Sequence, residues 1–530
     1  MISADTFSRN ILSWARDDRL TEKHVQHLHH IKRKEGITGM QLVHERTLEE
    51  QDYASTLDKL GLERQQAIFG LHAVIVGSGT LAELISAGLA GMGVGSITVM
   101  DTAMHYGEPD LLISSISSCK AEAITKEIGL INTDPSARFR WFRSPFSEGL
   151  IYGQAPQLVI DATNDPRSKR AIVRYAESNR VPFISASASQ NLAAYAAYWP
   201  HQGIGGKESP CLERLVLSGF SDERQGVPAS CMAAGLILED ARRQLFRYGD
   251  SDLGVPSNGI WRYDATDLNL TGKSHRTCPV DYRMRKALVI GCGAIGTTVA
   301  MQLGLLGVGR IDVVDMDIVE GSNVTRQLLH RGHYGEDKAA VVRQRLHEIN
   351  PLVRSTAIKG KVGAVGSEDM GWIQGMAGGK SVAEIVADYF SLSSTEQRAG
   401  LRLLNFDEVA GYDALFSCVD SKYARRWISE AAVKARVPAI DGGTGAHFGK
   451  VVLYIPFKTS TLDAQLCYST YPERQSCQID ASTIIPNYIV GAQMVAVAQA
   501  VFGNGAPQLD GIFKYDPTRK KKLTVYGRVA

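Results

Sequence analysis

The chain lacks an apolar run long enough to cross a membrane and carries almost no net charge. No stretch reaches the roughly 18 uninterrupted apolar residues that a spanning helix needs, and charges interrupt every apolar run of the opening MISADTFSRNILSWARDDRLTEK, unlike a secretion signal. The formal net charge is only +2, so no excess of one sign points to nucleic acid. We therefore expect a cytoplasmic protein with neither a membrane nor a nucleic-acid partner.

Cysteine is also sparse, with eight residues in 530 and no CxxC pair. Scattered thiols are typical of a reducing compartment, where most pack as small hydrophobic side chains. A structural zinc usually needs paired cysteines, so the absence of CxxC argues against zinc. With 44% hydrophobic and 22% charged residues, a chain of this length should fold as several globular domains.

The clearest feature that is present is an internal repeat. Residues 72–101 align without gaps on the segment that ends at Asp315, and each copy reads as strand, glycine turn, helix and second strand ending in aspartate. The alignment continues with residues 120–132 against 338–350. Short β-branched runs alternate with helical stretches, which predicts an α/β fold of two tandem Rossmann-like, doubly wound sheets with ligands at the carboxyl ends of the strands.

The repeat also predicts how the chain is divided. We expect an N-terminal helical extension at residues 1–70, a first copy at 71–275 and a second copy at 276–530. The second copy carries an insert at about 362–408 and a loop at about 457–486. Near its end, FKYDPTRKKKLTVYGRV predicts a β-hairpin around an Asp-Pro turn.

A glycine turn follows the first strand of the second copy. Gly291, Gly293 and Gly296 form GxGxxG between an apolar strand and a helix, where backbone N–H groups can approach a phosphate. Asp315 ends the next strand and can accept hydrogen bonds from ribose hydroxyls. This pattern by itself fits either NAD or ATP.

The residues that follow Asp315 favour ATP over NAD. The chain reads MDIVEGSNVTRQLLHR and then GEDKAAVVRQRL, which places Asn323, Arg326, Gln327 and Lys338 beyond the strand ends. Arginine and lysine can neutralise a triphosphate, and the guanidinium group can grip phosphate oxygens. Asp420, which follows the apolar strand ALFSCV, could hold magnesium against the phosphates. A dehydrogenase does not need this polar set.

These motifs, DMDIVEGSN with the following RQ, Lys338 and VDSKYARR, resemble the adenylation domain of the ubiquitin-activating, ThiF and MoeB superfamily over nearly the whole second copy. The resemblance implies ATP-dependent adenylation of the C-terminal carboxylate of a ubiquitin-like protein ending in glycine. It places Asp315 on the ribose, basic groups around the phosphates and Asp420 on magnesium. The implied nucleotide-binding residues are Gly291, Gly293, Gly296, Asp315, Asp317, Asn323, Arg326, Gln327 and Lys338.

The first copy departs from this pattern. Ala82 stands at the third glycine position, the loop after the aspartate is shorter, no arginine stands at the Arg326 position, and Asn164 replaces Asp420, although Lys120 is kept. We predict an inactive adenylation domain here. An inactive copy followed by an active copy resembles the architecture of ubiquitin-activating enzymes.

The family also supplies an arginine finger ahead of the glycine turn of the partner copy, and this chain does not show where it is. The usual Arg-Gln pair aligns on Tyr53 and Ala54. Arg46 and Arg64 are the alternatives.

Cys477 is the candidate nucleophile. It precedes QIDASTIIPNY and resembles the CxIxxxP crossover loop, whose cysteine takes the activated carboxylate as a thioester before transfer to a conjugating enzyme. A structural loop cysteine is the alternative. Where relatives hold zinc, this chain keeps Cys467 but offers Ser469 and Thr470 at the position of the second ligand. The implied catalytic residues are Cys477, Arg326, Lys338 and Asp420.

The resemblance further implies that the glycine-rich segment IDGGTGAHFGK, residues 440–450, forms a floor for the Gly-Gly tail of the substrate. Other interpretations stay open: a sulfur-carrier or ribosomal-peptide adenylyltransferase that forms no thioester, or a non-catalytic scaffold of two nucleotide folds. The sequence does not identify the ubiquitin-like partner, the downstream acceptor or the oligomeric state.

Overall fold

The structure is a computed structural model that describes residues 67–112, 118–151, 155–189, 192–200, 226–245, 259–264, 280–362, 400–445, 448–466, 483–503, 511–517 and 522–527. The chain divides into two compact units. The first comprises Met1–Ser274, Val319–Gly335 and Pro517–Lys520, and the second comprises His275–Ile318, Glu336–Asp516 and Lys521–Ala530. The expected helical extension at 1–70 lies almost entirely outside the described residues.

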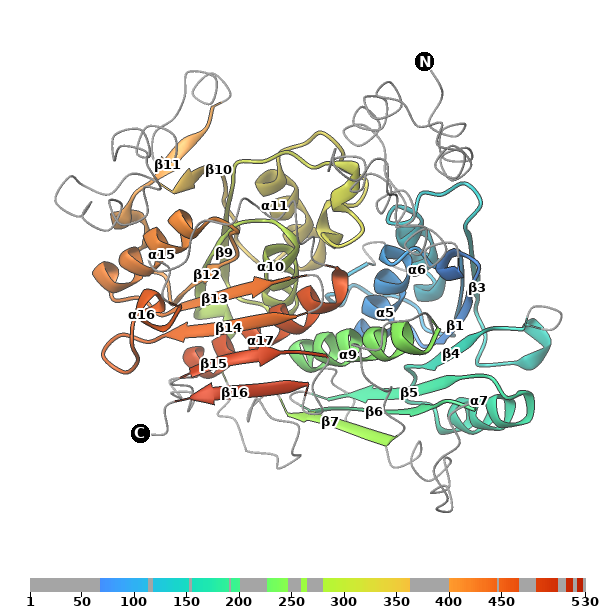
Figure 1. The fold of residues 1–530 in the computed structure, drawn as a ribbon. Helices are drawn as coiled ribbons and strands as arrows, with labels where there is room; N and C mark the ends of the chain where they lie inside the picture. The colour runs from blue at the N-terminus through green and yellow to red at the C-terminus, as the bar shows by residue number, and fades with distance from the viewer. Residues whose placement is uncertain are drawn as a thin grey trace, which may run out of the picture. The chain divides into compact units, whose positions relative to one another are not determined.

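The described part of the first unit contains a seven-stranded sheet in the order β3-β2-β1-β4-β5-β6-β7 (Figure 1). Its strands are β1 (His72–Val76), β2 (Ser96–Met100), β3 (Arg138–Phe142), β4 (Leu158–Asp161), β5 (Phe183–Ala188), β6 (Leu192–Tyr198) and β7 (Gly259–Asp264). Its longer helices are α5 (Thr80–Gly91), α6 (Lys120–Gly129), α7 (Pro166–Asn179) and α9 (Val227–Leu245). The first five strands in this order, from β3 through β2, β1 and β4 to β5, run parallel to one another. Strands β6 and β7 are added at one edge by antiparallel pairing.

The second unit repeats this plan with a nine-stranded sheet among its described residues, in the order β11-β10-β9-β8-β12-β13-β14-β15-β16. Its strands are β8 (Lys286–Ile290), β9 (Arg310–Asp315), β10 (Ala357–Val362), β11 (Arg402–Leu404), β12 (Ala414–Ser417), β13 (Ala439–Thr444), β14 (Gly449–Tyr454), β15 (Gly511–Tyr515) and β16 (Leu523–Gly527). Its helices are α10 (Ala294–Leu306), α11 (Lys338–Ile349), α15 (Lys422–Ala435), α16 (Leu462–Leu466) and α17 (Ile484–Phe502). The predicted pair of doubly wound α/β sheets is confirmed.

In each sheet the chain turns back across its first strand. The strands β1, β2 and β3 proceed toward one edge, and β4 then returns to pair with β1 on its other side. The second unit does the same when β12 pairs with β8. Such a reversal opens a crevice at the carboxyl ends of the strands, which is where doubly wound folds bind ligands.

The two copies share a buried ion pair in which the acid has moved to the neighbouring strand. The members are Asp161, Lys169 and Ser185 in the first copy and Ser417, Arg425 and Asp441 at the aligned positions of the second. The fully buried carboxylate accepts from the cation at 2.8 Å in the first copy and at 2.5 Å in the second. The acid is on β4 and the serine on β5 in the first copy, whereas the serine is on β12 and the acid on β13 in the second; the cation is on the following helix in both. Burying a carboxylate without a cation would destabilise the fold by several kcal/mol, so the pair is kept in both copies.

Helix α17 is long and apolar enough to cross a membrane by length and composition alone, and 83% of its apolar window is buried inside the protein. It packs against α10, β13 and β14. A Cβ at Gly491 would lie 2.5 Å from a methyl carbon of Thr298, so this glycine allows α17 to approach α10 closely. Burial in the second unit accounts for the apolar composition of α17. The cytoplasmic location stays a prediction.

The expected hairpin near the end of the chain is confirmed, because β15 and β16 pair antiparallel. The expected insert falls mostly on residues 363–399, which lie outside the described part of the chain. Beyond those residues, β11 pairs parallel with β10 and extends the sheet by one strand.

Candidate active site

The glycine turn of the second unit lies between β8 and α10. Gly291 has a φ of +95°, and a Cβ there would lie 2.5 Å from the carbonyl oxygen of Cys418. A Cβ at Gly296 would lie 1.8 Å from the carbonyl oxygen of Gly291. By contrast, a Cβ at Gly293, the residue that caps α10, would meet nothing within 4 Å. Two of the glycines are therefore required by the fold, and the third leaves open space at the start of the helix.

Asp315 lies directly beside this turn. Its carboxylate accepts hydrogen bonds from the backbone N–H groups of Cys292, at 2.6 Å, and Asp317, at 2.8 Å. Burial raises the pKa of Asp315, and the nearby Lys338 ammonium opposes that rise. The side chain is thus held at the carboxyl end of β9, adjacent to the start of α10. Its predicted contact with a ribose stays a prediction.

Lys338 is the first residue of α11 and is brought to the same strand end. Its Nζ lies 3.1 Å from an oxygen of Asp317, and its backbone N–H donates to the Asp317 carbonyl at 3.0 Å. The two side chains differ in exposure, at 9% for Lys338 and 56% for Asp317. An ion pair with one solvated partner is weak and exchangeable, so the ammonium group can be given up to an anionic ligand.

Asp420 follows β12 on the other side of β8. Its side chain is exposed, and it forms neither a hydrogen bond nor an ion pair with other described residues. The next residue, Ser421, caps α15 by accepting from the N–H of Ala424 at 3.3 Å. A solvated carboxylate with free oxygens suits a hard cation such as magnesium, so the residues present fit that ion.

Asn323, Arg326 and Gln327 lie in the segment Val319–Gly335, which belongs to the first unit. The Asn323 carbonyl accepts from the backbone N–H groups of Arg326, at 3.1 Å, and Gln327, at 2.8 Å, and the Asn323 side chain accepts from the N–H of Glu320. These bonds make a compact turn around Asn323. The predicted grouping of these residues with Lys338 and Asp420 stays a prediction.

Arg331 anchors the same segment within the first unit. Its Nε lies 2.5 Å from a carboxylate oxygen of Glu127 on α6, and its Nη2 donates to the carbonyl of Leu111 at 3.3 Å. The Arg331 side chain is only 3% exposed. Sequence analysis did not single out this residue, because its partners lie far away along the chain.

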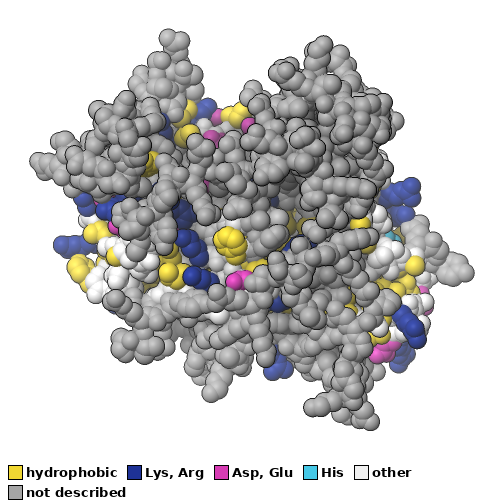
Figure 2. Space-filling view, in the orientation of Figure 1, with side chains coloured by type: hydrophobic (Ala, Val, Ile, Leu, Met, Phe, Trp, Pro, Cys, Tyr) yellow, Lys and Arg dark blue, Asp and Glu magenta, His cyan; other side chains and the backbone are white. Residues whose placement is uncertain are grey.

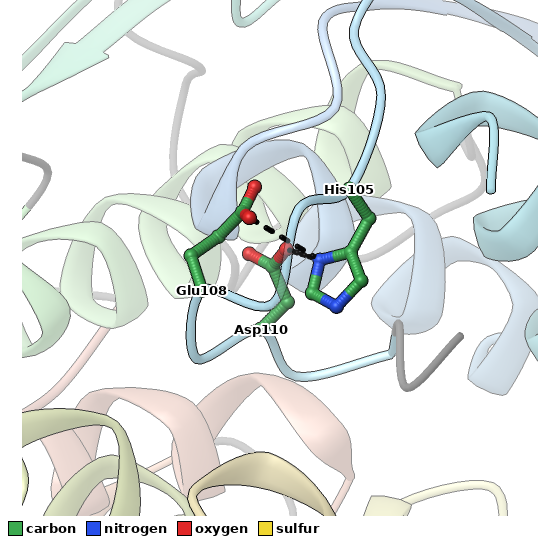
Figure 3. A group of neighbouring side chains, drawn as sticks. All are labelled: His105, Glu108 and Asp110. Carbon is green, nitrogen blue, oxygen red and sulfur yellow. Dashed lines mark hydrogen bonds and ion pairs between the residues drawn. The ribbon is translucent and has the colours of Figure 1, made fainter. Parts of the chain in front are cut away.

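In the first copy the aligned lysine forms ion pairs with two internal acids, Glu108 and Asp110, which Figure 3 draws together with His105. Lys120, which aligns with Lys338, lies 2.8 Å from Asp110 and also pairs with Glu108. Asp110 is at the same time 2.9 Å from Nδ1 of His105. The group of His105, Glu108 and Asp110 has the composition of a metal site, and both of its carboxylates lie against the ammonium group of Lys120, which offsets one of their two negative charges.

Two further features separate the first copy from the second. Asp101, which aligns with Asp315, accepts from the hydroxyl of Ser78 at 2.6 Å, and the exposed Asn164 offers no carboxylate.

Glu83 lies buried on α5 and accepts from the N–H groups of Leu111 and Leu112 at 3.3 and 3.0 Å. Burial, followed by the neighbouring Asp110, raises the pKa of Glu83 to about 8.

Cys292 of the glycine turn and Cys231 of the first copy are buried. Burial holds the pKa of Cys292 and of Cys231 above the usual range of a thiol, so neither is a reactive nucleophile. Cys477 lies outside the described residues, as do Cys467 and the zinc-loop positions. The arginine-finger candidates Arg46 and Arg64, with Tyr53 and Ala54, also fall there.

A model of the ThiF family matches the chain twice, at residues 53–238 and 281–526. The chain is 46% identical to the sulfur carrier protein adenylyltransferase of Thermus thermophilus over 259 residues, which cover 46% of this chain and 80% of that protein.

It is 26% identical to SUMO-activating enzyme subunit 2 of Dictyostelium discoideum over 219 residues, which cover 41% of this chain and 27% of that protein. It is also 26% identical to the SUMO-activating enzyme subunit uba-2 of Caenorhabditis elegans over 191 residues, or 35% of this chain and 26% of that protein. The matched region therefore spans about a quarter of the length of the SUMO-activating subunits.

Among solved structures, that of MccB from E. coli with ATP covers 47% of this chain and 66% of its own, at 19% identity and a TM-score of 0.33. A likeness at this level does not bear on function.

Proposed function

The chain belongs to the ThiF family, and on this premise we propose that its second unit adenylates the C-terminal carboxylate of a small ubiquitin-like or sulfur-carrier protein with ATP. Membership in the family supports ATP binding and adenylyl transfer. Its similarity to a SUMO-activating enzyme subunit and to a sulfur carrier protein adenylyltransferase supports the class of substrate.

The arrangement at the carboxyl ends of β8 and β9 carries this proposal. Open space lies above Gly293 at the start of α10, and Asp315 is fixed beside it. Among the described residues, Lys338 forms an ion pair with the solvated carboxylate of Asp317. A helix start with free space favours an anion, and the lysine adds a positive charge that an incoming phosphate can capture. The equivalent lysine of the first copy is already neutralised by two acids.

The reaction needs no general base. The attacking carboxylate is ionised near neutral pH, so its oxygen can attack the α-phosphorus while the bond to pyrophosphate breaks. Lys338 and Arg326 would hold the phosphates and offset the charge that spreads in the transition state. Magnesium, when bound, supplies further positive charge to phosphate oxygens, and Asp420 is the residue that would hold it.

We extend the proposal to a thioester on Cys477. The acyl-adenylate is a strong electrophile, so the thiolate would attack its carbonyl carbon, the bond to AMP would break and AMP would leave. Transfer to a conjugating enzyme would follow. A second candidate, activation of a sulfur carrier without a protein thioester, is favoured by the 46% identity to a sulfur carrier protein adenylyltransferase.

ATP–pyrophosphate exchange tests the adenylation step. We expect exchange that depends on a small protein with a C-terminal glycine and that is lost in Asp420→Ala but kept in Asn164→Ala, the aligned change in the first copy. Exchange that is indifferent to the partner, or equally sensitive to both changes, would contradict the proposal.

Cys477→Ala separates the two candidates. For thioester transfer, the variant keeps exchange but loses a covalent protein adduct that thiols can cleave. If the unmodified protein forms no such adduct while exchange is intact, the sulfur-carrier candidate stands.

A further inference from the structure

Lys450 of the second unit has no hydrogen-bonded anionic partner among the described residues. It lies on β14, is partly buried, and forms no hydrogen bond or ion pair within that part of the chain. Burial and the nearby Arg425 lower the pKa of Lys450, which shows that its charge is costly where it stands. A partly buried cation that no described carboxylate pairs with is suited to an anionic ligand.

The strand register brings Lys450 to a glycine of the neighbouring strand. Lys450 pairs with Gly443 of β13. A Cβ at Gly443 would lie 3.3 Å from Cε of Lys450 and 3.5 Å from Nη1 of Arg425. The absence of a side chain at Gly443 is therefore what allows the lysine and the arginine to come together.

The nearby acid cannot serve Lys450 as a full partner. Asp441 already accepts from Arg425 at 2.5 Å and from the hydroxyl of Ser417 at 2.6 Å, and it is fully buried. Arg425 thus balances Asp441, and the charge of Lys450 is in excess.

The excess is reinforced by the next strand. Lys514 of β15 stands directly opposite Lys450 in the antiparallel register, and it is among the groups that act on the Lys450 charge. Like charges in directly opposite positions destabilise a sheet. Figure 2 shows Lys and Arg side chains among hydrophobic and acidic ones on the face of the molecule that it draws.

This cationic face is distinct from the face that α17 covers. A Cβ at Gly442, the neighbour of Gly443, would meet Met494 and Val490 of α17. Because successive residues of a strand point to opposite faces, Gly443 and Lys450 lie on the face that Arg425 of α15 borders. Gly443 and Lys450 both belong to the glycine-rich segment that the sequence predicts as a floor for the substrate tail.

We propose that Lys450, beside Gly443 and Arg425, forms a binding site for a carboxylate side chain in the tail of the polypeptide substrate. The inference rests on the proposed function for the identity of the tail. A backbone can lie against the side-chain-free Gly443 while an aspartate or glutamate reaches Lys450. The site thereby selects substrates with an acidic residue shortly before the terminal glycines.

Binding of two fluorescent peptides to the full chain tests this site. Both end in Gly-Gly, one carries glutamates in the preceding positions and the other glutamines, and anisotropy is measured without ATP. We expect the acidic peptide to bind about tenfold more tightly at low salt, with a preference that shrinks as sodium chloride is added. Equal binding of the two peptides would refute the site.

Variants locate the preference. Lys450→Met keeps the apolar stem and should abolish the preference, and Lys450→Glu should invert it toward a peptide that carries lysines. Lys458→Glu, on the exposed turn after β14, changes the net charge equally and should leave the preference intact. If Lys458→Glu loses the preference for the acidic peptide as fully as the Lys450 variants do, the preference comes from the overall charge of the protein and not from a site at Lys450.

A last arm separates carboxylate from phosphate. If inorganic phosphate abolishes the preference more than chloride at the same ionic strength, the site takes phosphate and the proposal is wrong. Exchange of ATP and pyrophosphate is measured separately. If the chain lacks ATP–pyrophosphate exchange but prefers the acidic peptide, the proposed function is refuted and this site stands. If exchange is intact but the peptides bind equally, this site is refuted and the proposed function stands.

Discussion

Alanine at two glycines of the same turn should have different consequences. In Gly296→Ala the new Cβ would lie 1.8 Å from the carbonyl oxygen of Gly291, far inside contact distance, and a backbone atom cannot move aside cheaply. In Gly293→Ala the new Cβ meets nothing within 4 Å, and the backbone there, at φ −76° and ψ −155°, suits alanine. The first change should damage the fold and the second only the ligand site.

The magnitudes follow from these distances. Overpacking against backbone costs about 1–3 kcal/mol or more, which lowers Tm by about 3–10 °C for a unit of this size. Gly293→Ala should leave Tm unchanged but raise KM for ATP about tenfold, a difference of about 1.4 kcal/mol, because its methyl group fills the space through which a phosphate would approach the helix.

Differential scanning calorimetry and ATP–pyrophosphate exchange measure these two effects. Ala82→Gly, at the third glycine position of the first copy, is the matched control and should change neither exchange nor KM. A Gly296→Ala protein with the Tm of the unmodified chain would refute the packing argument. A Gly293→Ala protein with unchanged KM would refute the assignment of the open space to ATP.

Three other predictions concern single charges. Asp420→Ala should lower the rate of ATP–pyrophosphate exchange at least tenfold, while Asn164→Ala should not. The exchange rate of Asp420→Ala should also depend less on the magnesium concentration than that of Asn164→Ala. Glu127→Gln should destabilise the first unit by about 1–3 kcal/mol, because it leaves the buried Arg331 without its carboxylate; the calorimetric transition measures this loss. Glu83 has a pKa of about 8 in the folded protein and near 4.5 when unfolded, so the folded state holds the extra proton and stability should fall as pH rises from about 5 to 8. Glu83→Gln should flatten that slope in urea unfolding across this range, and an unchanged slope would contradict the assignment.

Much of the second unit could be predicted from the sequence, because the information is local. A strand, a glycine turn and a helix follow one another directly, and Asp315 and Asp420 come just after apolar strands. Parallel strands bring their carboxyl ends to one edge, so the order of residues along the chain is sufficient to place these side chains there.

The capture of Lys120 could not be predicted in the same way. The sequence shows a lysine kept at the position of Lys338, which taken alone would suggest a working site. Only the fold of the preceding loop reveals that Glu108 and Asp110 reach the ammonium group. The prediction of an inactive first copy was based on the missing groups and did not include this added pairing.

What the sequence by itself determined was the duplication and the α/β fold, because repeated local patterns specify elements and their order; it also carried the hypothesis that the second copy adenylates a carboxylate. The tertiary structure decided that Arg331 meets Glu127, 204 residues away, and that Lys450 and Arg425 meet across Gly443. Such pairings depend on strand register and on which helix borders which face. Those are set by packing of the whole unit, and no short stretch of sequence contains them.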